Sequence, residues 1–195
     1  MPLKTLCVVK MKSKVFYAFL GTFLTGVLFG IVCSVLSPSF AESLFSNLMQ
    51  FFGGAVEGNT DKFSLFTFIF LNNSRVAVIC ALGGVLFGIV PAGILFFNGF
   101  IVGIVIQYFN AQGESLAKIL LAIIPHGVIE IPAFAVAGLG GVEWYLEIIS
   151  GEGSLRERFL SGLRKSMKML ALSLVMLLVA AFVEAYITPI IASSV

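Results

Sequence analysis

The chain has 195 residues, of which 59% are hydrophobic and only 11% are charged, and its mean hydropathy is +1.08. Soluble domains are typically about 45–50% apolar and about 25% charged, so the composition excludes an ordinary soluble protein and predicts a multi-pass membrane protein. The net charge of +2 says little by itself, and no segment has the size and polarity of a separate soluble domain. We therefore expect one integral membrane domain over residues 1–195.

Five apolar segments are candidates for membrane-spanning helices, because about 20 residues cross the hydrocarbon core. The run over 76–109 is too long for one crossing, and Pro91 with Gly93 predicts a turn within it. Pro125 and Pro132 fall inside the fourth segment, where a proline removes a helix hydrogen bond. The prediction is an all-α bundle of about five spans with a broken fourth helix and short interfacial helices. The expected spans are 15–36, 70–90, 92–109, 116–141 and 169–188.

Basic residues gather before the first and the last expected span and predict the orientation of the chain. Cytoplasmic segments of membrane proteins carry such an excess, so we expect a cell-membrane protein with its N-terminus in the cytoplasm and its C-terminus outside. Lys62, Arg75 and Lys118 are then left outside. The basic residues assigned to the cytoplasm are Lys4, Lys10, Lys12, Lys14, Arg156, Arg158, Arg164, Lys165 and Lys168.

The second basic segment, residues 154–167, is expected to form an amphipathic helix on the cytoplasmic surface. Leu155, Phe159 and Leu163 share one apolar face. Ser154 and Glu157 have the spacing of a capping box, which begins a helix.

Glycines four residues apart predict close helix packing, since small residues let helix backbones approach each other in lipid. Packing within the chain is the favoured interpretation, and a homodimer is the alternative. The pairs are Gly26 and Gly30, Gly84 and Gly88, and Gly99 and Gly103.

A set of polar residues interrupts the apolar segments. Charged groups at the bilayer centre cost about 2.5–3.5 kcal/mol on insertion scales and are usually functional. His126, the one histidine of the chain, lies four residues before Glu130, so both occupy one helix face. The predicted intramembrane polar cluster consists of Asn72, Asn73, Arg75, Asn98, His126, Glu130 and Glu184.

The spans give each member of this cluster an expected place. Asn72, Asn73 and Arg75 are expected at the outer end of the second span. Asn98 is a candidate donor to the carbonyl of residue 128, which Pro132 frees. Glu184 lies on a small, polar helix face that should point into the bundle, where it could meet His126, Glu130 or Arg75.

Four chemical roles remain open for the cluster. It could be a hydrogen-bonded network that locks the helices, a proton or ion relay, a zinc site of His126, Glu130 and Glu184, or a catalytic centre. A metalloprotease of the HExxH type needs two histidines. No nucleophile with a base, phosphate-binding loop or nucleic-acid motif is found, so no catalytic residue is assigned and no cofactor beyond zinc is considered.

The ordered polar motifs resemble those of the stage II sporulation protein M family. They are Asn72-Asn73, Asn98-Gly99, Pro125-His126-Gly127 with Glu130, and Glu184 with Ile187-Thr188-Pro189, within a likeness over about residues 10–190. The resemblance implies a multi-spanning membrane protein. The bacterial namesake works with two other sporulation proteins, one a peptidoglycan hydrolase, in septal wall thinning and engulfment. The resemblance supplies no reaction.

The favoured functional hypothesis is a non-enzymatic subunit or scaffold of a membrane complex. Its expected partners are the lipid bilayer, other membrane proteins and a second copy of the chain, and no nucleic acid. The alternatives are a small transporter or ion or proton channel that uses the polar cluster, and then a metal-dependent membrane enzyme.

Overall fold

The computed structural model describes residues 3–56 and 61–192, with side chains from residue 11 onward except at 49, 51–56 and 192. The side chains of Lys4 and Lys10, which entered the charge argument, therefore lie outside the described residues. Every element in the described ranges is helical. The elements are α1 (Leu3–Leu36), α2 (Pro38–Val56), α3 (Lys62–Gly83), α4 (Ile89–Ala111), α5 (Leu116–Ser150), α6 (Leu155–Phe182), the π-helical turn η1 (Val183–Ile187) and α7 (Thr188–Ala192).

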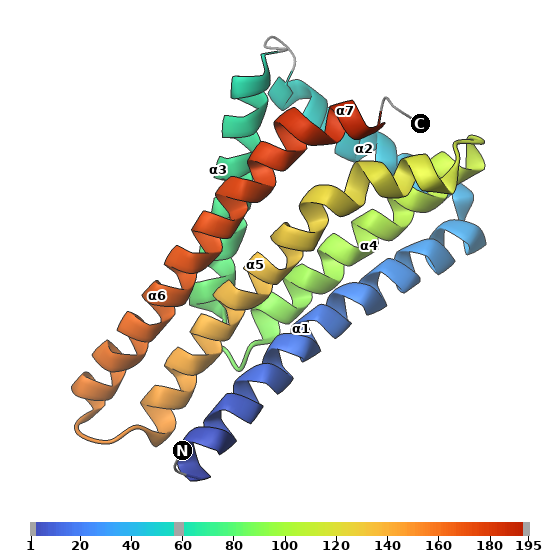
Figure 1. Cartoon of the computed structure of the whole chain (residues 1–195). Helices are drawn as coiled ribbons and strands as arrows, with labels where there is room; N and C mark the ends of the chain where they lie inside the picture. The colour runs from blue at the N-terminus through green and yellow to red at the C-terminus, as the bar shows by residue number, and fades with distance from the viewer. Residues whose placement is uncertain (1–2, 57–60, 193–195) are drawn as a thin grey trace.

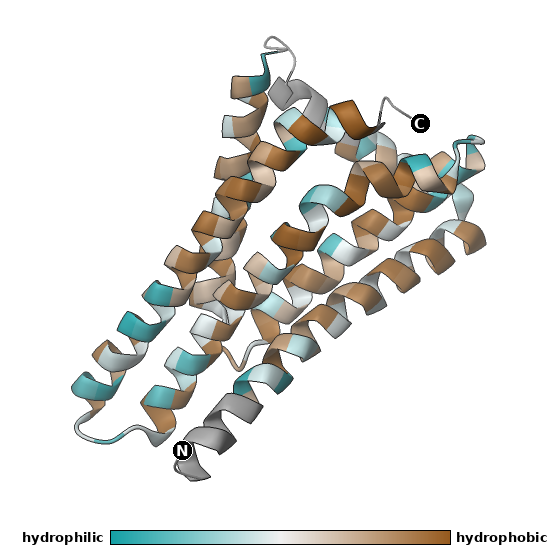
Figure 2. Ribbon diagram, in the orientation of Figure 1, coloured by the Kyte–Doolittle hydropathy of each residue, from teal (hydrophilic) through white to brown (hydrophobic). Residues whose placement is uncertain are grey.

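Five helical segments of the described chain are long and apolar enough to cross a membrane. They are α1 from Met11 onward, α3, α4, α5, and the continuous segment Leu155–Ile191 formed by α6, η1 and most of α7. Figure 2 shows apolar residues along most of the helix surfaces and polar residues concentrated near the α5–α6 connection. The prediction of an all-α membrane bundle is confirmed.

The bundle is arranged around α5, which contacts α1, α3, α4 and α6. In Figure 1, α1 and α4 run side by side on one flank of α5, and α3 and α6 lie on the other. Phe134 of α5, Leu95 of α4 and Leu177 of α6 are fully buried in the core, together with Cys80 and Ala81 of α3. Burial of these side chains joins both flanks to the central helix.

Glycines bring α1 and α4 into backbone contact. A methyl group added at Gly26 or Gly30 would collide with the carbonyl oxygen of Phe96 or Phe100, respectively. In the other direction, a methyl group at Gly99 would collide with the carbonyl oxygen of Phe23. Two of the expected glycine pairs therefore face one another within a single chain.

The helix that precedes the α3–α4 turn lies earlier in the sequence than expected. Instead of spanning residues 70–90, α3 covers Lys62–Gly83. Gly88 in the following turn has a φ of 75°, a left-handed conformation that suits glycine. The turn therefore lies before Pro91, and the span begins and ends earlier in the sequence than predicted.

Two helices are longer and more regular than their sequence patterns suggested. α5 runs from Leu116 to Ser150 through Pro125 and Pro132, so the expected break is wrong, and Figure 1 shows a helix that bends. A proline removes one backbone bond and clashes with one carbonyl, which the bend accommodates.

The amphipathic segment 154–167 does not form a separate helix, because it is the first half of α6. Its predicted capping box of Ser154 and Glu157 is confirmed.

Charged residues pair at the end of the bundle that holds the N-terminus. Lys12 Nζ lies 2.7 Å from Glu143 Oε1, and Lys165 contacts Glu147. Arg158 Nη1 donates to the carbonyl of Ile148 at 3.0 Å. These contacts tie the ends of α1, α5 and α6 together where the apolar segments finish.

We predict that Gly99→Ala lowers the free energy of unfolding by about 1–3 kcal/mol, because the added methyl group overpacks the α1–α4 contact. Gly93→Ala is the matched control on the same helix, since its methyl group meets nothing within 4 Å. Alanine has the higher helix propensity, so this control should be neutral or stabilising. Thermal unfolding in detergent compares the two, and equal melting temperatures would contradict the packing argument.

Candidate functional site in the bundle

The candidate site begins with two side chains on one turn of α5. His126 and Glu130 are four residues apart in a helix that remains regular between Pro125 and Pro132. Residues at this spacing lie above one another on the same face. Both are partly buried, and the Nδ1 atom of His126 is buried without a hydrogen-bond partner. The local helix therefore fixes an imidazole and a carboxylate beside each other.

The third side chain comes from the π-helical turn at the end of α6. Glu184 lies in η1, where the backbone N–H of Thr188 bonds to the carbonyl of Val183, five residues earlier. Such turns are rare and are often found at functional sites. The face predicted to point inward does so, since Ser173, Leu177, Ala180, Ala181 and Thr188 are all buried.

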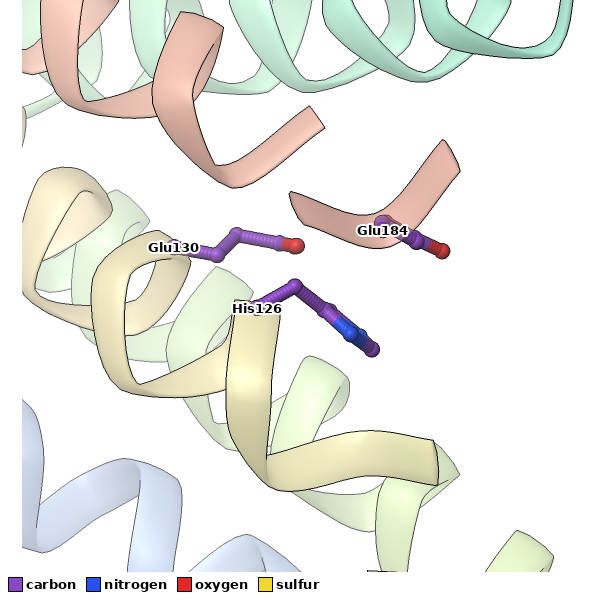
Figure 3. Close-up of side chains that lie close together, drawn as sticks. All are labelled: His126, Glu130 and Glu184. Carbon is purple, nitrogen blue, oxygen red and sulfur yellow. The ribbon is translucent and has the colours of Figure 1, made fainter. Parts of the chain in front are cut away.

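His126, Glu130 and Glu184 converge between α5 and η1. One ligand atom from each residue can be chosen so that all lie within 4.8 Å of one another. Figure 3 shows the Glu130 and His126 side chains extending from α5 toward the segment that bears Glu184. Two carboxylates this close would repel each other strongly if both were ionised in a medium of low dielectric constant.

These three residues line a cavity of about 360 Å³. Asn73 of α3 is buried and lines the same cavity as Glu130. Asn98 Nδ2 donates to the carbonyl of Ile94 on its own helix at 2.9 Å, and not to the carbonyl of residue 128 that the sequence suggested. The lining residues are Leu65, Phe68, Ile69, Asn72, Asn73, Asn98, His126, Glu130 and Glu184.

Arg75 is the member of the predicted cluster that the structure places elsewhere. Its side chain is exposed and does not line the cavity, and no ion pair joins it to Glu184 in the described part of the chain. It lies in the middle of α3, not at the end of a span, because α3 begins at Lys62.

The sequence interpretation missed the apolar part of the cavity wall. Leu65, Phe68 and Ile69 belong to the first half of α3, which the predicted spans leave mostly in a loop. Their spacing continues through Asn72 and Asn73 as one helix face. That periodicity was the signal that could have extended the span and found them.

The five long apolar helical segments of the described chain define it as a multi-pass integral membrane protein. The model of the family "Stage II sporulation protein M" matches residues 19–189, and the chain belongs to this family. The resemblance seen in the polar motifs is thereby confirmed.

Two relatives of Methanocaldococcus jannaschii are similar to this chain, and both are described as uncharacterized proteins. One is 32% identical over 130 residues, covering 66% of this chain and 73% of the relative. The other is 31% identical over 135 residues, covering 67% of this chain and 58% of the relative, less than two thirds of its length. No solved structure matches the chain.

We predict that Asn73→Ala lowers the free energy of unfolding by about 1–3 kcal/mol, because it removes a buried amide from the polar lining of the cavity. Asn110→Ala, at an exposed position near the end of α4, should change stability little. Thermal unfolding of both variants in the same detergent provides the measurement. A melting temperature for Asn73→Ala as high as that of Asn110→Ala would show that the amide does not stabilise the cavity.

Proposed function

We propose that this protein is a non-enzymatic subunit of a membrane complex, and that the α3 surface around Arg75 binds an acidic transmembrane helix of another protein. The observation that carries the proposal is an exposed arginine in the middle of a helix long enough to cross the bilayer. The distribution of basic residues supports a cytoplasmic N-terminus.

The depth of Arg75 follows from the position of α3 in the bundle. At 1.5 Å per residue, Arg75 lies about 20 Å along the axis from Lys62 and about 12 Å from Gly83. Gly84, directly after the helix, packs against Gly138 and Gly141 of α5. By the same count, Arg75 is level with the region of Glu130, far from the paired charges at the end of the bundle.

The surroundings of Arg75 on α3 are apolar and exposed. Leu71, Val78, Ile79 and Leu82 adjoin it at helical spacing and are 50%, 38%, 51% and 52% exposed, respectively. We call these four residues with Arg75 the Arg75 face. A charge at this depth is unfavourable unless it is paired, so a carboxylate from a neighbouring helix would stabilise the face.

The chain itself offers no suitable carboxylate among its described residues. Glu130 and Glu184 line the cavity, whereas Glu143 and Glu147 pair with lysines at the end of the bundle. A second copy would therefore bring no exposed acidic group to the depth of Arg75. This argues for a different protein as the partner.

The polar cavity fits the same role as an internal support. Its polar side chains come from α3, α4, α5 and η1, so hydrogen bonds formed among them would hold four segments in one arrangement. A buried network of this kind would keep the Arg75 face in a fixed geometry for assembly. The family namesake likewise works in a membrane complex.

A transporter or an ion or proton channel is the second candidate function. It is favoured by one observation, the cavity of about 360 Å³ with several polar side chains within the spans. Ionisable residues in such positions often lie on ion or proton pathways.

We predict that Arg75→Leu abolishes association with the partner while the purified protein remains folded, since the substitution removes an exposed charge and no observed contact. A photo-crosslinking residue at Val78, introduced in membranes of the source organism, should give an adduct with another membrane protein. The adduct should disappear in the Arg75→Leu background. The same crosslinker at Leu28, which is 65% exposed on α1, is the control for random collisions.

The same crosslinking experiment can contradict the proposal. Adducts only with lipid or with a second copy, or an adduct that persists in Arg75→Leu, would remove the acidic partner helix from consideration. An unchanged melting temperature of Arg75→Leu in detergent separates loss of assembly from loss of folding.

For the transport hypothesis, we predict a pH-dependent ion flux in proteoliposomes that Glu130→Gln abolishes without loss of folding. The isosteric amide keeps the shape of the cavity and removes an ionisable group from it. Glu114→Gln, at the exposed start of the α4–α5 connection, is the control. A wild-type flux no greater than that of liposomes without protein would exclude this candidate, as would a flux that Glu130→Gln leaves unchanged.

A further inference from the structure

We propose that His126, Glu130 and Glu184 form a binding site for a divalent transition-metal ion of the zinc type within the membrane-spanning bundle. The proposal concerns the cavity and does not depend on the Arg75 face. Its geometric basis is the convergence of three ligand atoms within 4.8 Å.

The donor set suits such an ion. Imidazole nitrogen and carboxylate oxygen are both ligands of zinc, and sites with three protein ligands keep a further position open for water. Imidazole also favours the first-row transition metals over magnesium and calcium, which prefer oxygen alone.

A divalent ion matches the charge of the cluster when both carboxylates are ionised. A neutral histidine with two carboxylates carries a charge of −2, which a divalent cation cancels. In a low-dielectric cavity, this replaces the repulsion between Glu130 and Glu184 with two attractive contacts. A monovalent cation would leave net charge within the bilayer, which is unfavourable.

The backbone supplies two independent reasons to assign a ligand here. The α5 helix sets His126 and Glu130 on one face at a spacing of four residues. On the opposite wall, η1 departs from α-helical geometry at the turn that carries Glu184. A side-chain observation agrees with these two, since the buried Nδ1 of His126 on α5 lacks a hydrogen-bond partner. A metal ion would engage the imidazole and use the carboxylate that the irregular turn supplies.

The three ligand atoms need to move only slightly closer together to bind one zinc ion. Ligands about 2.1 Å from a tetrahedral zinc ion lie about 3.4 Å apart, whereas the three atoms lie within 4.8 Å. Rotation of the flexible glutamate side chains can cover this difference. The cavity of about 360 Å³ leaves room for water at the open position.

Asn73 provides the kind of support that metal sites use. It lines the cavity together with Glu130, where its amide could orient the carboxylate, as residues beyond the direct ligands commonly do. With a metal bound, α5 and η1 would be joined by coordination bonds, and α3 would be linked to them through Asn73.

The first test is metal content and affinity of the purified, tag-free protein in detergent. After equilibration with zinc and dialysis, we expect one zinc ion per chain by elemental analysis. Glu130→Gln and Glu184→Gln should each weaken zinc binding at least tenfold, whereas Glu114→Gln should leave it unchanged. Size-exclusion profiles and circular dichroism establish that each variant is folded.

The second test uses the fact that the chain has a single histidine. Zinc should slow the reaction of His126 with diethyl pyrocarbonate in the wild-type protein and have little effect in Glu184→Gln. Because both proteins contain the same histidine, the comparison reports coordination and not merely folding.

Three results would overturn the metal site. They are an absence of zinc binding even at a large molar excess of zinc over protein, unchanged affinity in both glutamine variants, and histidine reactivity that does not respond to zinc. The crosslinks through the Arg75 face are read without added metal, so the two proposals can fail separately.

Discussion

A polar side chain in the hydrocarbon core has no water to bind, and this constraint governs how the whole bundle is organised. Backbone groups satisfy it by remaining helical, as in every described element. Polar side chains gather in one place, since His126, Glu130 and Glu184 line a single cavity. Arg75 is the exception, since its side chain is exposed on the outside of the bundle. The cavity thus gathers polar groups inside the bundle, whereas Arg75 lies on its exposed surface.

The packing of the helices makes this separation possible. Glycines allow α1 and α4 to contact each other backbone to backbone, so one flank of the bundle is closed without bulky side chains. On the other flank, α3 and α6 leave space for polar groups next to α5. The bundle has a tight α1–α4 contact and a cavity beside α5 because small and large side chains are unevenly distributed along its helices.

Much of this architecture could be predicted from the sequence, because apolar length and helical spacing are local properties. The helical class, the membrane character and the cap at Ser154 all follow from short stretches of sequence. The proximity of His126 and Glu130 needed only the helix period. The convergence of Glu184 with them could be suggested from its inward-facing side but not placed, because it depends on the contact between α5 and η1.

The errors came from features that tertiary contacts decide. The limits of α3 were misplaced because the turn after it lies at 84–88, where Gly88 is close to Val142 and Phe19 of distant segments, and not at Pro91 and Gly93. A break in α5 was predicted from its two prolines, but each proline removes only one backbone bond, and the helix continues through both with a bend. Arg75 was assigned to an aqueous end as a consequence of the first error. Its true environment became visible only when the limits of α3 were known.

The π-helical turn determines how the residues after it are oriented around the helix axis. A turn with bonds five residues apart holds one residue more than an α-helical turn, so α6 and α7 are out of phase by about 100°. Deleting one residue between 183 and 187 would restore a regular helix and rotate the following segment around the axis. A variant with a perfectly α-helical last span would then keep its hydrophobicity and nearly its full length, but the buried Thr188 and the rest of α7 would turn away from the face that they now occupy.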